Sequence, residues 1–83
     1  MNTNDIEIIK KKILYRCSYT GTKETDLIYH KLIVNKINQL NYQELIQLSN
    51  LFKEVSDTDI FLSLTKKIKP HKNYKLLFKK LIE

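Results

Sequence analysis

The sequence predicts an all-α fold, a small antiparallel bundle of four to five short helices. Glycine and proline are the residues that turns rely on, and the chain of 83 residues has only one of each, Gly21 and Pro70. An all-β domain would need more of both. Apolar residues recur at steps of three and four, which is the spacing of a buried helical stripe. The breaks between these stripes are short, as in an antiparallel bundle.

The N-terminal region divides into a tail and a first helix. Residues 1–4 are polar and are expected to form a disordered tail, and residues 5–83 are expected to form a single helical-bundle domain. The first helix is predicted over 5–17, because Asp5 is a suitable N-terminal cap. Its apolar stripe consists of Ile6, Ile9, Ile13 and Cys17.

Two further helices are predicted in the middle of the chain. One follows a polar break and covers 23–37, with apolar residues on more than one stripe and Leu27 in the core. The other covers 42–53. Its start is indicated by Asn41, followed three residues later by Glu44, an asparagine variant of the capping box.

The C-terminal third is predicted to hold the last two helices. Ser56 with Asp59 indicates a helix start, so the fourth helix is placed at 57–68. It ends before Pro70, because proline cannot continue a helix. The fifth helix is placed at 73–82. The residues expected to be largely buried include Ile9, Ile13, Leu27, Leu48, Phe52, Phe61 and Leu64.

No arrangement of residues indicates catalysis or metal binding. A chain of this length has a thin core and little room for a deep substrate cavity. Cys17 ends an apolar stripe and is expected to be a structural thiol. Nothing in the sequence brings His30 or His71 to it, and these three residues alone are too few for a zinc site. We therefore expect no enzymatic activity, no catalytic residue and no metal ligand.

The expected location is the cytoplasm. No apolar run reaches the roughly 18 residues of a membrane span. The polar and acidic stretch from Met1 to Glu7 has no signal-peptide pattern. A single cysteine cannot form an intramolecular disulfide, which fits a reducing compartment.

The formal net charge of +6 leaves two interpretations open. A positive charge can attract nucleic acid, but fourteen of the fifteen basic residues are Lys and only Arg16 is Arg, whereas base readout favours arginine. AT-rich coding would also produce many lysines. The Lys-rich C-terminal end is either a solvated face or a surface for an acidic protein, an anionic lipid surface or RNA. A basic RNA- or ribosome-binding helical protein is the alternative function.

The segment 16–26, Arg-Cys-Ser-Tyr-Thr-Gly-Thr-Lys-Glu-Thr-Asp, is a polar turn between two predicted helices. It is either a simple helix corner, in which Glu24 and Asp26 favour the positive end of a helix, or a polar contact site for a partner. Gly21 can adopt a positive φ or let another backbone approach closely.

This turn is the first of three short segments whose order and spacing resemble those of a known protein family. Residues 18–27 resemble an Arg-Gly-x-x-Glu-x-Asp signature. Residues 40–45, Leu-Asn-Tyr-Gln-Glu-Leu, resemble a Leu-Ser-x-x-Glu helix start, and 52–61 resemble a Leu-Leu-Glu-x-x-Asp-x-Asp-Leu-Phe segment. Pro70 falls where the helix of that family also ends in a proline. In these features the chain resembles the flavinylation factors of succinate dehydrogenase.

The resemblance implies a five-helix assembly factor. Such a factor binds the flavoprotein subunit of succinate dehydrogenase, and in some members that of fumarate reductase. It promotes the covalent attachment of FAD to a histidine of that client. FAD then belongs to the client and is not bound stably by the factor itself. We expect a monomer without a nucleic-acid partner.

The resemblance also indicates a partner-binding surface. It places Gly21, Glu24 and Asp26 among the residues that contact the client. The arginine that precedes the glycine in the family is Thr20 here, and threonine cannot make a bidentate guanidinium contact. The role of that arginine is then vacant, or it is taken by Arg16 or Lys23.

Overall fold

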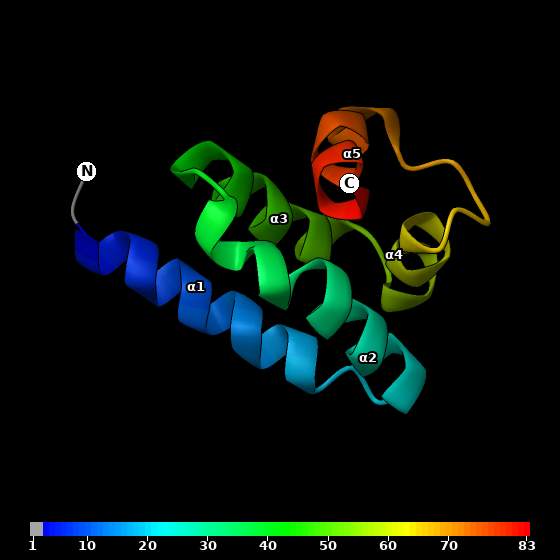
Figure 1. Ribbon diagram of the computed structural model, residues 1–83, viewed down its shortest axis with the longest axis horizontal. Helices are drawn as coiled ribbons and strands as arrows, with labels where there is room; N and C mark the ends of the chain where they lie inside the picture. The colour runs from blue at the N-terminus through cyan, green and yellow to red at the C-terminus, as the bar shows by residue number, and fades with distance from the viewer. Residues whose placement is uncertain (1–2) are drawn as a thin grey trace.

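Five α-helices make up the fold of the part of the chain that the structure describes (Figure 1). The structure is a computed structural model that describes residues 3–83, with side chains from Asp5 onward. The α-helices are α1 (Thr3–Ser18), α2 (Lys23–Leu32), α3 (Tyr42–Glu54), α4 (Asp57–Leu64) and α5 (Lys75–Ile82). Two short 3-10 segments are η1 (Val34–Gln39) and η2 (Lys72–Tyr74). Residues 3–83 contain no strand, so the all-α prediction is confirmed.

The described residues form an elongated molecule of 37 × 26 × 22 Å, and the turn between α1 and α2 lies at its lower edge in Figure 1. α1 packs against α2 and α3, α2 packs against α4, and α5 packs against α3 and α4. α1 begins at Thr3, two residues before the predicted start at Asp5. Met1 and Asn2, the rest of the predicted tail, lie outside the described residues.

Capping residues fix the starts of α3 and α4 where the sequence predicts them. Asn41 Oδ1 accepts the backbone N–H of Glu44 at 2.8 Å, and Glu44 Oε1 accepts the backbone N–H of Asn41 at 2.8 Å. This reciprocal pair is a capping box. Ser56 Oγ accepts the backbone N–H of Asp59 at 3.2 Å at the start of α4. Each cap satisfies backbone donors that a helix start leaves unpaired.

The second predicted helix, 23–37, is wrong as a single α-helix. α2 ends before Ile33, and the chain continues as η1, in which the Lys36 N–H donates to the Ile33 carbonyl at 3.0 Å. The consecutive β-branched residues Ile33 and Val34 weaken an α-helix at this point. The tighter winding that follows buries both Ile33 and Ile37.

The fourth predicted helix, 57–68, is also too long. α4 ends at Leu64, and Lys66 adopts a φ of +64°. The Lys67 N–H then donates to the Leu62 carbonyl at 2.8 Å, which is the long backbone bond of a Schellman-type helix end. The helix therefore stops well before the proline, and the chain crosses to η2 and α5 as an irregular loop.

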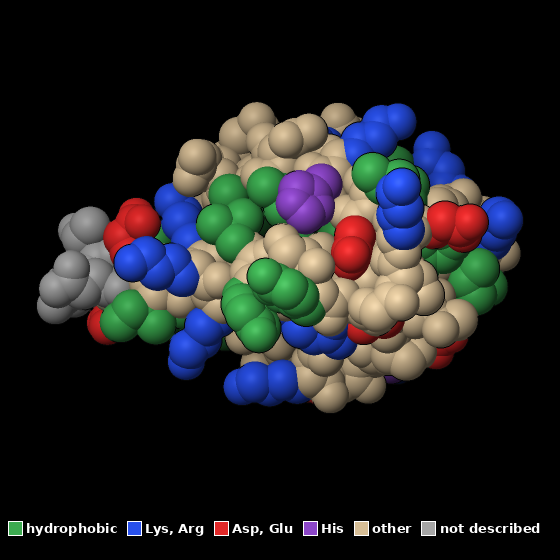
Figure 2. Space-filling model, turned by 90° about the horizontal axis from the view of Figure 1, so that it is seen from below, with side chains coloured by type: hydrophobic (Ala, Val, Ile, Leu, Met, Phe, Trp, Pro, Cys, Tyr) green, Lys and Arg blue, Asp and Glu red, His purple; other side chains and the backbone are tan. Residues whose placement is uncertain are grey.

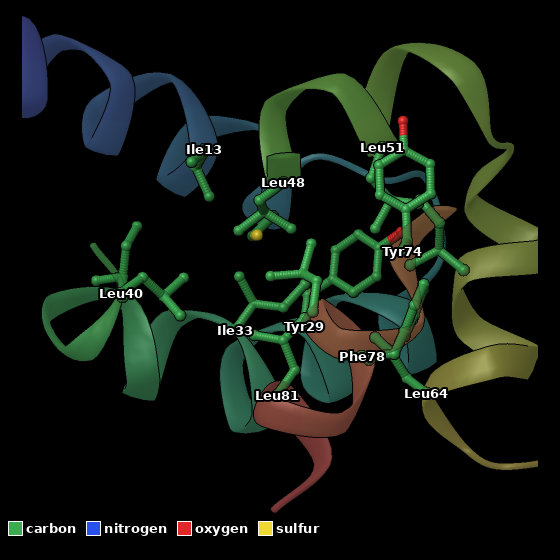
Figure 3. Close-up of a cluster of buried hydrophobic side chains, with 14 of the residues drawn as sticks. Ile13, Tyr29, Ile33, Leu40, Leu48, Leu51, Leu64, Tyr74, Phe78 and Leu81 are labelled. Carbon is green, nitrogen blue, oxygen red and sulfur yellow. The ribbon is translucent and has the colours of Figure 1, made fainter. Parts of the chain in front are cut away.

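Side chains from all five helices meet in one core (Figure 3). The buried apolar residues are Ile13, Cys17, Tyr29, Ile33, Ile37, Leu40, Leu45, Leu48, Leu51, Ile60, Leu64, Tyr74, Leu77, Phe78 and Leu81. Among the residues predicted to be buried, Ile13, Leu48 and Leu64 are confirmed. Ile9, Phe52 and Phe61 are only partly buried.

Leu27 is not a core residue, and its predicted burial is wrong. Its side chain is 61% exposed, and the buried residues of α2 are Thr25 and Tyr29. Positions two apart lie on different sides of a helix. Thr25 can be buried because the Thr22 hydroxyl donates to its hydroxyl at 2.6 Å. Tyr29 can be buried because its hydroxyl donates to Asp57 at 2.8 Å. Polar side chains with internal partners thus occupy the buried face of α2.

Candidate functional site

The turn between α1 and α2 is built around Gly21. Its φ of +92° lies in the left-handed region, where a side chain would be strained. A Cβ atom placed on this residue would meet no atom within 4 Å. The conformation of the turn, and not crowding inside the protein, therefore requires glycine. The space next to the Gly21 backbone is open to an approaching partner.

Asp26 holds the turn closed from the first turn of α2. Its Oδ1 accepts the backbone N–H of Thr20 at 3.2 Å and also accepts the Thr20 hydroxyl. Both residues are half-buried. Thr20 thus closes the turn at the position where the family signature has an arginine. A partner that binds Asp26 Oδ1 must compete with these two hydrogen bonds.

Glu24 and Lys23 face solvent beside the turn. They are the first two residues of α2, whose N-terminal cap is Thr22, and Thr22 Oγ1 accepts the backbone N–H of Thr25 at 3.3 Å. Both side chains are exposed, and the two ion pairs in the described part of the chain involve neither of them. The Glu24 carboxylate lies near the positive end of a helix and can accept hydrogen bonds from a partner.

Arg16 is held by another helix instead of projecting from the turn. Its Nη1 donates to Asp57 Oδ2 at 2.8 Å, and its guanidinium lies 5.4 Å from the centre of the Phe52 ring. The hydrogen bond that Arg16 donates to the Asp57 carboxylate raises the pKa of Arg16. Asp57 also accepts the Tyr29 hydroxyl at 2.8 Å. Lys23, in contrast, is an exposed basic residue directly after the turn.

The structure therefore brings most of the predicted site residues together. Those that form or adjoin the turn are Thr20, Gly21, Lys23, Glu24 and Asp26. Arg16 lies in the last turn of α1, with its side chain engaged at the start of α4. A direct contact between the Arg16 guanidinium and a partner would require its bond to Asp57 to break.

Two exposed tyrosines, Tyr15 in α1 and Tyr19 directly after it, were not predicted as part of the site. Tyr15 and Tyr19 are each 69% exposed, with ring centres 4.6 Å apart. Their four-residue spacing, off the buried stripe that ends at Cys17, is the signal that could have identified them. Exposed tyrosines often anchor protein interfaces. On the face seen in Figure 2, exposed hydrophobic side chains lie in small groups among Lys and Arg side chains.

The remaining candidate groups include a buried cysteine and a histidine that contacts its own helix. Cys17 is fully buried, and burial raises the pKa of its thiol to about 12, so the reactive thiolate is scarce at neutral pH. His30 Nδ1 lies 2.9 Å from the Asp26 carbonyl oxygen of its own helix. The described residues contain no group of three or more His, Cys, Asp or Glu side chains that could hold a metal ion. No helix in residues 3–83 is long and apolar enough to cross a membrane.

Comparison with known proteins identifies a family whose matched region includes the turn. Residues 11–83 match the family described as flavinator of succinate dehydrogenase, Sdh5. No curated protein and no solved structure gave a significant match. The family match includes the whole turn, the end of α1 and all four later helices. The chain therefore belongs to the Sdh5 family, the flavinators of succinate dehydrogenase.

Proposed function

We propose that this protein binds the flavoprotein subunit of succinate dehydrogenase and promotes the covalent attachment of FAD to it. Its family makes it an assembly factor in the flavinylation of succinate dehydrogenase. The observation that supports binding through the turn is the geometry of Gly21. This residue combines a φ of +92° with open space next to its backbone. Glu24, whose side chain is exposed, follows Gly21 by three residues in the sequence.

The proposed mechanism is that the protein holds its client in a reactive arrangement. Covalent flavinylation needs the FAD ring and the client histidine close together and correctly oriented. A small rigid bundle that binds one arrangement of the client shifts the population toward that arrangement. The bond then forms between groups of the client and FAD. In this proposal FAD belongs to the client, the factor acts as a monomer, and the flavoprotein subunit of fumarate reductase is a second client to test.

Two substitutions of Gly21 separate partner contact from backbone strain. Gly21→Ala and Gly21→Arg force the same strained φ, but only arginine fills the open space. We expect Gly21→Arg to reduce client flavinylation about tenfold or more and Gly21→Ala to reduce it far less. The readout is in-gel fluorescence of covalent FAD on the denatured client subunit, in a strain that lacks its own factor. Equal effects of both substitutions would contradict binding through this space.

Glu24 and Thr20 test the polar part of the turn. Glu24→Ala should reduce flavinylation, whereas Glu7→Ala, an equally exposed acid near the start of α1, should not. Thr20→Arg restores the side chain of the family signature but removes the hydroxyl bond to Asp26. Thr20→Val removes the hydroxyl, with its bonds to Asp26 and to the Thr22 carbonyl, but adds no guanidinium, and it is the control. Wild-type levels of covalent FAD with both Glu24→Ala and Gly21→Arg would exclude the turn as the working surface.

A further inference from the structure

The positive charge of this protein is concentrated at its C-terminal end. Residues 60–82 contain seven lysines and no acid. The other sixty residues contain eight basic and nine acidic side chains, so their net charge is −1. A coding bias toward lysine would act along the whole chain and does not account for this separation. The excess charge is thus a local property of the loop after α4 and of α5.

Six of these seven lysines have no acidic partner within the described residues. Lys80 is the exception, because its Nζ lies 2.7 Å from Glu44 Oε1. The only other ion pair that the described residues form joins Arg16 to Asp57. The six remaining lysines are all exposed. We call them, together with Leu76, the lysine face: Lys66, Lys67, Lys69, Lys72, Lys75, Lys79 and Leu76.

A surface hollow shows that lysines of the loop and of the last helix lie together. It has a volume of about 430 Å³ and is lined by Lys69, Pro70, Lys72 and Lys75. The lining of this hollow includes no acid, so its three cations repel one another and create a local positive potential. Lys69 also lines a neighbouring hollow together with Glu54 and Asp59, so the excess of positive charge is greatest at Lys72 and Lys75. Negatively charged groups that enter this region relieve that repulsion.

Leu76 adds an apolar element to this charged face. It is 80% exposed, more than the other large exposed hydrophobic side chains, which are Ile8, Tyr15, Tyr19, Leu27 and Ile68. The opposite side of α5 is buried in the core through Leu77, Phe78 and Leu81. Leu76 follows Lys75 directly and lies one helical turn before Lys79, with which it shares a face of α5. Lys72 lies in η2, directly before this helix. An exposed aliphatic side chain between lysines is the pattern of a helix that lies on a membrane surface.

We propose that the lysine face binds the surface of an anionic lipid bilayer, with its lysines at the headgroups and Leu76 inserted at the boundary with the acyl chains. Lysines close to an anionic leaflet are attracted by its surface potential. In Figure 1 the loop after α4 runs along the right and upper edge of the molecule, whereas the turn between α1 and α2 lies at the lower edge. The turn therefore stays accessible to a protein client while the lysine face rests on lipid, and this proposal does not depend on the proposed function.

The structure favours lipid over the other anionic partners. Single-stranded RNA binds by stacking on exposed aromatic rings, but Tyr74 and Phe78 are both buried. The single arginine, Arg16, is engaged by Asp57 and lies outside the lysine face. The cores of protein interfaces are rich in aromatic residues and arginine and poor in lysine. Several exposed lysines near one exposed aliphatic side chain match a bilayer surface better than they match single-stranded RNA or an acidic protein.

The test measures flotation of the protein with lipid vesicles. One set contains phosphatidylcholine alone, and the other contains equal parts of phosphatidylcholine and phosphatidylglycerol. We expect binding to the mixed vesicles only, weakened strongly by high salt, because salt screens exposed charges. The triple variant Lys72→Gln, Lys75→Gln, Lys79→Gln should bind on the order of a hundredfold more weakly. Leu76→Ser should weaken binding several-fold without changing the net charge.

A matched triple variant controls for net charge. Lys11→Gln, Lys12→Gln and Lys31→Gln remove the same charge from exposed positions of α1 and α2. This variant should retain most of the binding to mixed vesicles, and circular dichroism should show all variants folded. Equal losses in both triple variants, or no binding to mixed vesicles at low salt, would overturn the proposal. Tighter binding to a single-stranded RNA than to the mixed vesicles, lost in the first triple variant, would overturn it in favour of a nucleic-acid site.

Discussion

Arg16 of α1 and Asp57 of α4, 41 residues apart in the sequence, form an ion pair of 2.8 Å. The other carboxylate oxygen of Asp57 accepts the hydroxyl of the buried Tyr29 of α2. The guanidinium also lies over the ring of Phe52 of α3. One carboxylate at the start of α4 thus connects directly to α1 and α2. This connection fixes the helices that flank the proposed partner-binding turn.

The first prediction concerns this connection. Asp57→Ala leaves the Tyr29 hydroxyl without its acceptor and the half-buried Arg16 without its counter-charge. We expect it to lower the free energy of unfolding by about 2–4 kcal/mol. Tyr29→Phe removes one hydrogen bond and should cost about 1 kcal/mol. Urea unfolding followed by circular dichroism measures both. A loss below about 0.5 kcal/mol for Asp57→Ala would mean that the pair behaves like an exposed salt bridge.

The second prediction concerns Cys17 and alkaline pH. Burial raises the pKa of the folded thiol from an ordinary value of 9.0 to about 12. The unfolded thiol therefore loses its proton above pH 9 while the folded thiol keeps it. The stability linked to this proton is complete below pH 9 and decreases as pH rises toward 12. The free energy of unfolding should fall by at most about 1.4 kcal/mol per pH unit in this window from Cys17 alone.

A variant without the thiol isolates this contribution. Cys17→Ala lacks the titrating group, so its stability should fall less than that of the wild type between about pH 8 and about pH 10, the range that spans the ordinary pKa of a thiol. Tyr29, whose pKa burial also raises, is present in both proteins, and Cys17 is only the smallest contributor to its shift. The native thiol should also react with a disulfide reagent only as fast as the protein unfolds. Parallel pH dependences of the two proteins would contradict the prediction.

Local signals in the sequence were sufficient to locate the starts of α3 and α4. Asn41 and Glu44 lie three residues apart and satisfy each other's backbone donors, so the start of α3 depends on no distant contact. The end of α4 is different. It depends on a positive φ at Lys66, a residue whose side chain gives no sign of that conformation. Pro70 marked only the latest position at which the helix could end.

Long-range contacts explain the other differences between the sequence-based predictions and the structure. The exposure of Leu27 follows from the burial of Tyr29, whose hydroxyl is satisfied by Asp57, 28 residues away. The pattern of apolar residues alone could not reveal this partner. In the candidate site, Gly21 was identifiable because it is the only glycine. The engagement of Arg16 could not be predicted, because the sequence does not show that α1 ends beside the start of α4.

The last prediction concerns Lys66, which occupies a backbone conformation that favours glycine. Its φ of +64° lies in the left-handed region at the end of α4, the position where helices most often carry glycine. Removing the side chain relieves about 1–2 kcal/mol of steric cost, partly offset by the greater freedom of glycine in the unfolded chain. Lys66→Gly should therefore raise the free energy of unfolding by about 0.5–1 kcal/mol, measured by urea unfolding.

Lys67→Gly is the matched control for this gain. It removes the same charge from the adjacent residue, and among the described residues Lys66 is the only one other than glycine with a positive φ. Glycine at position 67 gains nothing from relieved strain and adds freedom to the unfolded chain, so this variant should be destabilised by about 0.5–1 kcal/mol. Opposite signs for the two variants would assign the gain to the backbone conformation. A similar gain in both would instead assign it to reduced repulsion among the clustered lysines, and the strain argument would fail.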